Sequence, residues 1–185
     1  MELRGALSRT SFEAALTPAH VTSSQIVQGA MMMGIVVFAT VVAFLYTQAP
    51  PVEPTEAEID LVRLMTFGHL GLLAVNVGVS LFLARRVFSP EAIGEGVGVI
   101  DAQALAARAV QQQRTAMIVR MALLEGSAFF GLVICLLATT NGVLGSAPEY
   151  WINLLSPFLI ISFGIATFPT KERLVSWFEE RFLTS

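Results

Sequence analysis

The sequence has 185 residues, of which 55% are hydrophobic and 14% are charged, and its mean hydropathy is +0.70. This balance is typical of a membrane protein, because a water-soluble domain of this size carries more charge. The net charge of −3, with no extended run of lysine or arginine, excludes nucleic acid as an expected partner. The single cysteine, Cys135, allows neither an intramolecular disulfide nor a Cys/His cluster, so no metal site is expected.

Four apolar segments are each long enough to cross the hydrocarbon layer of a bilayer, which takes about 20 residues. They predict membrane-spanning helices over residues 26–46, 61–84, 117–140 and 150–168. Amphipathic segments at about 3–16 and 171–183 predict two helices on the membrane surface, the first ending at a break at Thr17-Pro18. The second segment places its apolar residues on one face: Leu174, Trp177, Phe178 and Phe182. The expected fold is all-α, a four-transmembrane-helix bundle that forms a single integral membrane domain over residues 1–185.

The segment between the second and third spans contains two possible helix starts. Ser89-Pro90-Glu91 has the residue types of a helix start, but three glycines follow it closely. Asp101 can cap a second start, and the residues after it are rich in helix formers. We therefore expect one long helix that begins near Asp101, extends outside the membrane and continues through the third span. Tyr150 and Trp151, at the start of the fourth span, have the position of an aromatic belt.

The basic residues predict the orientation of the chain in its membrane. Ten of the eleven lysines and arginines lie in the N-terminal segment, the central segment or the C-terminal tail, when Arg120 at the near end of the third span is included, and the exception is Arg63. By the positive-inside rule, both termini and the central segment are cytoplasmic. The expected location is a bacterial inner membrane.

The first and third spans resemble each other. A shift of 92 positions lays the segment that starts at Ile26 over the segment that starts at Ile118 and aligns Gly34 with Gly126. This pattern favours two hairpins in parallel orientation, related by an axis along the membrane normal. Met33 is then the counterpart of Glu125.

The second span carries two distinct faces. Thr66, His69, Asn76 and Ser80 fall within about 80° of arc, a polar stripe that predicts the side facing the bundle interior. Gly68, Gly71 and Gly78 lie on a different face, which we expect to pack closely against another helix.

Glu125, inside the third span, is the most informative residue of the sequence. A carboxylate that faces lipid at this depth costs at least about 2.5 kcal/mol, so Glu125 is expected to face protein or water. Arg120 is about 140° away around the helix and is not its counter-ion. Asn76 lies at a comparable depth, about 13 Å below Arg85, and is the expected partner.

Two interpretations of these polar residues remain open. Glu125 either is protonated and fixes helix packing through a hydrogen bond to Asn76 or to a backbone carbonyl, or binds and releases a proton or cation, with His69 as a second station. His69 either is a satisfied interior histidine or is an axial ligand to a haem or chlorophyll-type macrocycle.

Two stretches resemble a known group of proteins. Residues 120–131, RMALLEGSAFFG, and the Pro169-Thr170-Lys171-Glu172 stretch are similar to small uncharacterised bacterial four-span membrane proteins. The ALLEG stretch is also similar to the carboxylate helix of rotary ATP synthase c subunits. The chain departs from c subunits because it lacks their alternating-glycine helix, and because Glu125 lies on the first helix of a hairpin.

No nucleophile elbow, phosphate-binding loop, zinc spacing or dinucleotide fingerprint is present, so an enzyme is not expected. The sequence favours an accessory or structural subunit of a homo-oligomer or larger membrane complex, with lipid and other membrane subunits, or its own copies, as partners. The alternatives are a proton- or ion-handling protein that uses Glu125 and a pigment- or haem-associated subunit that uses His69.

Overall fold

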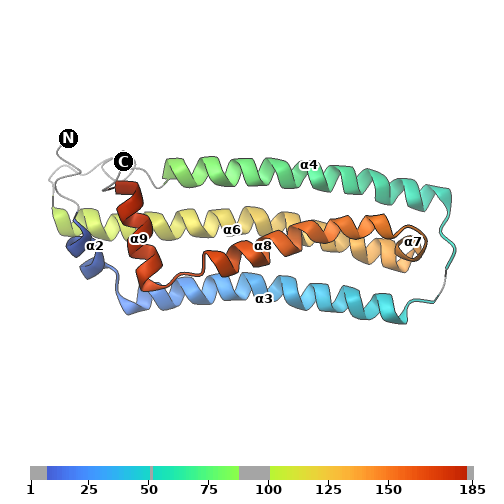
Figure 1. The fold of residues 1–185 in the computed structure, drawn as a ribbon, viewed down its shortest axis with the longest axis horizontal. Coiled ribbons are helices and arrows are strands. Elements are labelled where there is room, and N and C mark those ends of the chain that lie inside the picture. Colours follow the sequence, from blue (N-terminus) through green and yellow to red (C-terminus); the bar gives the residue numbers. More distant parts are fainter. Residues whose placement is uncertain (1–7, 51, 88–100, 183–185) are drawn as a thin grey trace. The chain divides into compact units, whose positions relative to one another are not determined.

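The computed structural model describes residues 8–50, 52–87 and 101–182, and these contain helices but no strand. In chain order, the elements are α2 (Arg9–Ala15), α3 (Pro18–Gln48), α4 (Glu56–Val87), α6 (Ala102–Thr140), α7 (Val143–Ser146), the 3-10 helix η1 (Pro148–Leu154), α8 (Leu155–Ala166) and α9 (Lys171–Phe182) (Figure 1).

Four of these segments are long and apolar enough to cross a membrane: α3, α4, α6, and η1 together with α8. A helix satisfies its own backbone hydrogen bonds, which is why apolar segments of this length take this form in lipid. The predicted all-α fold with four spanning helices is confirmed.

The helix starts follow from local sequence. Pro18 occupies the first position of α3, where its missing N–H is not needed, and the break between α2 and α3 is where the sequence predicted it. At α4, the Thr55 hydroxyl accepts from the Glu58 N–H at 3.3 Å, while the Glu58 carboxylate accepts from the Thr55 N–H at 2.8 Å. This reciprocal capping box fixes the first turn of α4. At its other end α4 extends through Arg85 and Arg86 to Val87, beyond the predicted end of the span.

The predicted long helix is confirmed as α6, whose 39 residues extend from Ala102 to Thr140. At its start, the Asp101 carboxylate accepts a hydrogen bond of 2.9 Å from the Gln103 N–H. The other predicted start, Ser89-Pro90-Glu91, and the glycines that follow it lie outside the described residues.

The connection to the fourth span requires a glycine. Gly142 follows α6 with φ of 72°, a left-handed conformation that side chains rarely adopt, and the Val52 carbonyl group occupies the place of a side chain. The fourth span then begins as the 3-10 helix η1. Tyr150 is largely buried in the protein instead of lying in an aromatic belt, while Trp151 packs edge-on against Tyr46 with ring centroids 5.0 Å apart.

The chain divides into two compact units. The single integral membrane domain stays a prediction. Unit 1 comprises residues 1–29, 81–120 and 167–185, and unit 2 comprises residues 30–80 and 121–166. The helices α3, α4 and α6 each contribute residues to both units.

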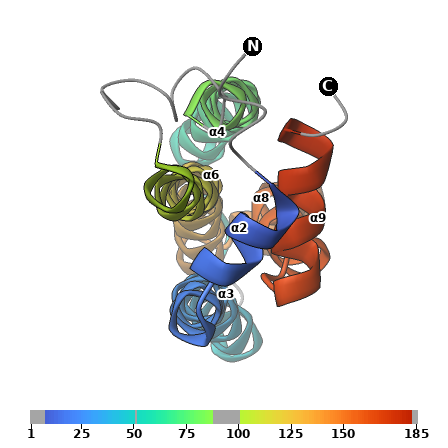
Figure 2. The same cartoon turned by 90° about the vertical axis from the view of Figure 1, so that its left-hand side faces the viewer.

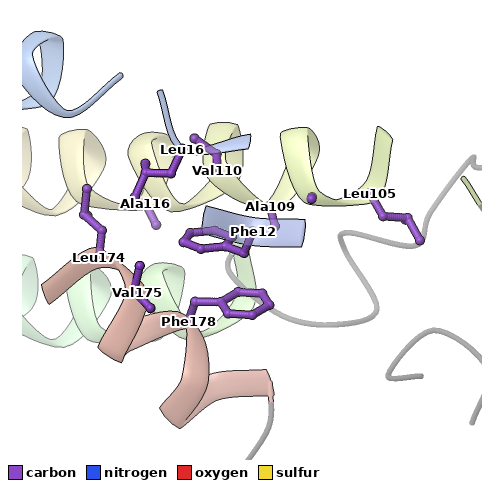
Figure 3. Close-up of a cluster of buried hydrophobic side chains, with 10 residues drawn as sticks. Phe12, Leu16, Leu105, Ala109, Val110, Ala116, Leu174, Val175 and Phe178 are labelled. Atoms are coloured by element: carbon purple, nitrogen blue, oxygen red, sulfur yellow. The ribbon is translucent and has the colours of Figure 1, made fainter. Parts of the chain in front are cut away.

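Unit 1 is built around the first half of α6, against which α2 and α9 pack (Figure 2). The rings of Phe12 and Phe178 stack with centroids 4.2 Å apart, beside Ala109 of α6 (Figure 3). Arg9 of α2 links the same two short helices by its ion pair to Glu179 of α9 at 2.9 Å, and it also pairs with Glu13 within α2 at 2.6 Å.

The apolar faces of these short helices are covered by protein. Phe12 and Phe178 are fully buried, and Leu16 and Leu174 are each 5% exposed. The sequence assigned these faces to the membrane surface, but each helix covers the apolar face of the other. The side chain of Phe182 and the N-terminal residues before Ser8 lie outside the described part.

In unit 2, α8 lies lengthwise beside the adjoining parts of α3, α4 and α6 (Figure 1). The fully buried apolar side chains of unit 2 include Ile35 of α3, Leu132 of α6 and Ile160 of α8. Large apolar residues are also exposed, among them Leu64 and Phe158 at 70% and 68%. Apolar residues therefore cover the outside of these helices as well as their core, which is the arrangement of a protein whose solvent is lipid.

Candidate functional site

The polar residues of unit 2 meet in a buried hydrogen-bond network centred on His69 of α4. Nδ1 of His69 lies 2.9 Å from Oδ1 of Asn153 in η1, and Nε2 lies 2.7 Å from the hydroxyl of Ser156 in α8. The Ser156 hydroxyl is also 3.1 Å from the Ser127 carbonyl of α6. None of these four residues is more than 1% exposed. The network therefore joins three spans without contact with lipid or water.

The amide of Asn153 determines the tautomer of His69. Its Nδ2 donates to the Tyr150 carbonyl and to the Thr66 hydroxyl, both at 2.9 Å. A carbonyl can only accept, so Nδ2 must point toward Tyr150 and Oδ1 toward His69. Nδ1 of His69 therefore carries a proton. In the neutral imidazole Nε2 then presents a lone pair, so it competes with the Ser127 carbonyl for the single proton of the Ser156 hydroxyl.

This geometry argues against His69 as an axial ligand. Both ring nitrogens have a protein partner within 3 Å, so neither is available to a haem or chlorophyll-type metal. The edge of the ring faces Phe130, with centroids 6.0 Å apart. The contacts agree with the satisfied interior histidine that the sequence left as one of two interpretations.

Gly131 of α6 allows the network to be this compact. A Cβ atom at this position would lie 2.9 Å from both Nε2 of His69 and the Ser156 hydroxyl oxygen, and still closer to the Asn153 carbonyl oxygen. No side chain fits there without displacing the network. Gly131 is thus a site of close helix approach in unit 2 that the sequence analysis did not identify.

The polar stripe of α4 faces the interior as predicted. Thr66, His69 and Ser80 are buried, with exposures of 7%, 0% and 3%. Asn76 is half-buried, and its amide nitrogen donates to the Leu123 carbonyl at 3.1 Å and to the Ser127 hydroxyl at 2.8 Å. Ser127 thus connects Asn76 to the His69 network.

The expected hydrogen bond between Asn76 and Glu125 is not formed. Leu123 and Ser127 lie one turn apart on the same side of α6, while Glu125 lies about 160° away from each of them around the helix. Within the described part of the chain, no group makes a hydrogen bond or an ion pair with the half-buried Glu125 carboxyl. On the same side of α6, Ala122 and Gly126 are exposed.

The predicted packing face of α4 is not covered by the described part of the chain. Gly68, Gly71 and Gly78 are exposed, and no described atom lies within 4 Å of a Cβ built at any of them. The interior side of α4 is its polar stripe, and the glycines lie on the opposite side. Their packing against another helix stays a prediction.

Three members of the network were missed by the sequence analysis: Ser127, Asn153 and Ser156. Each is a polar residue inside a predicted span, and this is the signal that could have identified them. Asn153 and Ser156 are also three residues apart, a spacing that places them on one face of a helix.

Comparisons with protein-family models, with curated proteins and with solved structures find no match. The class of the protein follows from the fold and the network together. Four long apolar helices, with apolar side chains outward and a closed polar network inside unit 2, define a multi-pass integral membrane protein. The similarity to small bacterial four-span membrane proteins stays a prediction.

Proposed function

We propose that the chain is a non-catalytic subunit, accessory or structural, of a membrane complex or homo-oligomer. The observation that carries this proposal is the unpaired carboxyl of Glu125 in a spanning helix. A membrane carboxyl without a hydrogen-bond partner costs several kcal/mol, of which a donor from another helix recovers a part. The described chain offers no such donor, so we infer that a second chain supplies it.

The surroundings of Glu125 suit a helix of another subunit. Ala122 and Gly126 are exposed and four residues apart, so they lie one above the other beside Glu125. Small residues at this spacing let two helix backbones approach closely, and the van der Waals packing that results favours helix association in lipid. The exposed glycines of α4 provide a second surface of the same type.

A structural role also agrees with the state of the His69 network. The side chains of Thr66, His69, Asn153 and Ser156 bind one another and nearby carbonyls, and their burial leaves none of them exposed to a substrate. Such a network fixes the relative positions of helices within unit 2. The network therefore favours a role in positioning helices over a role in catalysis.

The distribution of basic residues supports a bacterial inner membrane as the location, with both termini in the cytoplasm. The partners that fit this location are lipid, other membrane subunits and further copies of the chain.

The second candidate function is proton or cation handling by Glu125, and the same unpaired carboxyl favours it. Glutamine separates the two candidates because it retains hydrogen-bonding capacity but cannot ionise. In the subunit proposal, Glu125→Gln keeps the assembly. In the proton-handling alternative, the same variant abolishes proton flux in liposomes.

The test is native mass spectrometry of the protein extracted from its own membrane in mild detergent, with an absorption spectrum of the same sample. We expect an assembly that Glu125→Leu and Gly126→Ile dissociate and that Glu125→Gln preserves. Val133→Ala, a change on an exposed position of the same helix, is the control. A colourless monomer for the wild type would contradict the subunit proposal, and an absorption band lost in His69→Ala would instead support the pigment-associated alternative.

A further inference from the structure

A small pocket in unit 1 lies between the beginning of α3 and the first half of α6. Its apolar wall consists of Leu16, Val110, Met117 and Leu174, and its polar wall includes His20, Gln113 and Arg114. The cavity volume is about 10 Å³, which accommodates a single water-sized group. One oxygen atom of a larger group can therefore enter, while the rest of that group stays at the mouth.

Arg114 is incompletely satisfied in this pocket. One of its terminal nitrogens, Nη2, donates to the Ser23 hydroxyl at 2.7 Å, which fixes the plane of the guanidinium group. Its Nε is buried and has no hydrogen-bond partner in the described structure. No described carboxylate forms an ion pair with it. A buried donor of a cation that lacks an acceptor is unfavourable, and an anion at the pocket would satisfy it.

The other polar groups at the pocket also favour an anion. The Thr17 hydroxyl lies 3.0 Å from Nδ1 of His20, so Nε2 is the ring nitrogen left for a ligand. The Gln113 amide is held by its hydrogen bond of 2.9 Å to the Leu174 carbonyl. Among the described residues, no aspartate or glutamate lines the pocket. A guanidinium group with an unpaired Nε–H donor suits an oxygen of a phosphate group.

The position of the pocket along the helices suggests where that phosphate comes from. Ser23 and Arg114 each precede the start of a predicted apolar span by three residues, Ile26 in α3 and Met117 in α6. Three residues correspond to about 4.5 Å along a helix. The headgroup layer of a bilayer extends about 5 to 7 Å beyond the hydrocarbon on each side, so the guanidinium group lies at the level of lipid phosphates.

We propose that the pocket lined by Arg114 and His20, with Ser23 holding the guanidinium group, binds the phosphate group of an anionic phospholipid. The proposal does not depend on the Glu125 face, because all of its residues belong to unit 1. Lipid bound here would contact α3 and α6 at one point and hold the two helices together at the membrane boundary.

The test uses the full-length protein in a neutral detergent and counts bound lipid by native mass spectrometry. Phosphatidylglycerol is titrated in, and diacylglycerol, which has the same tails but no phosphate, serves as the comparison. We expect Arg114→Gln to lower the affinity for the first bound phosphatidylglycerol about tenfold, because a charge-assisted hydrogen bond is lost. Ser23→Ala keeps the charge but frees the guanidinium group, and we expect it to weaken binding a few-fold.

Arg108→Gln is the matched control, because it removes the same charge from the same helix outside the pocket. We expect it to change lipid binding less than twofold. Equal losses in Arg108→Gln and Arg114→Gln, or equal retention of diacylglycerol and phosphatidylglycerol by the wild type, would overturn the proposal. Thermal unfolding of each variant identifies misfolding, and Ser23→Ala remains decisive if Arg114→Gln does not fold.

Inorganic phosphate at millimolar concentration distinguishes a lipid from a soluble ligand. If phosphatidylglycerol stays bound in the presence of inorganic phosphate, the lipid is supported as the source of the phosphate group in the pocket. Displacement of the lipid with the appearance of bound phosphate, abolished in Arg114→Gln, supports the phosphate site but overturns its assignment to lipid.

Discussion

Replacing Gly131 by alanine tests whether the buried network of unit 2 depends on close helix approach. The new methyl group would lie 2.9 Å from Nε2 of His69 and from the Ser156 hydroxyl oxygen. The Asn153 carbonyl oxygen is nearer still and belongs to the backbone of η1, so it cannot move as a side chain would. The substitution must therefore separate α6 from η1 or break the hydrogen bonds of His69.

The expected loss of stability follows from two effects. Overpacking in a well-packed core costs about 1–3 kcal/mol. Hydrogen bonds between membrane helices contribute about 0.6 kcal/mol each on average, so the two bonds of His69 contribute about 1 kcal/mol. Alanine recovers about 0.5–1 kcal/mol through its better helix propensity. We expect a net decrease in the free energy of unfolding of about 1–3 kcal/mol.

The measurement is reversible unfolding in bicelles, with Gly71→Ala as the control. Gly71 also lies in a spanning helix, but no described atom is within 4 Å of a Cβ built there. The control is expected to be neutral or to increase stability by up to about 1 kcal/mol. Equal effects of the two substitutions would refute the reasoning, and a destabilising Gly71→Ala in the monomer would support the packing face that the sequence predicted.

Three further predictions concern the other contacts. Asn76→Ala removes two hydrogen bonds and is expected to lower the free energy of unfolding in bicelles by about 0.6–1.7 kcal/mol; no loss would show that these bonds do not stabilise unit 2. Phe12→Ala removes a fully buried ring and is expected to destabilise unit 1 by about 3–5 kcal/mol, detected as faster proteolysis near α2; an unchanged cleavage rate would contradict the stacked contact. Hydrogen bonds from its own backbone N–H and from the Thr170 hydroxyl lower the pKa of the Glu172 carboxyl in the folded protein. The ionised carboxyl therefore stabilises the start of α9 above the pKa of the unfolded chain, and this stabilisation is lost as the pH falls through the lower pKa of the folded protein. Trp177 fluorescence, recorded in a Trp151→Phe background, is expected to change in that acidic range, and an invariant signal would contradict the coupling.

Much of the fold could be predicted because the signals are local. The length of each apolar segment determines whether it spans, so all four spans were identified. The start of α6 depends on the capping residue Asp101 and the helix formers after it, which are neighbours in sequence. The interior side of α4 was also predictable, because Thr66, His69 and Ser80 are polar residues that lipid disfavours.

The partners within the candidate site could not be predicted in the same way. His69 bonds to Asn153 and Ser156, which are 84 and 87 positions away, and no local pattern selects them from the other polar residues of the spans. The error over Glu125 has the same origin, because Asn76 is at a suitable depth but meets the other side of α6.

The sequence alone determined that the protein crosses a membrane four times as helices, and which side of α4 is polar. Only the tertiary structure decided how α6 is rotated about its axis, so that Ser127 faces Asn76 and Glu125 does not, and which glycine is the point of close approach. The physical reason is that a helix apolar on nearly all sides is compatible with lipid at many rotations. Hydrogen bonds and steric contacts between segments distant in sequence select one of them.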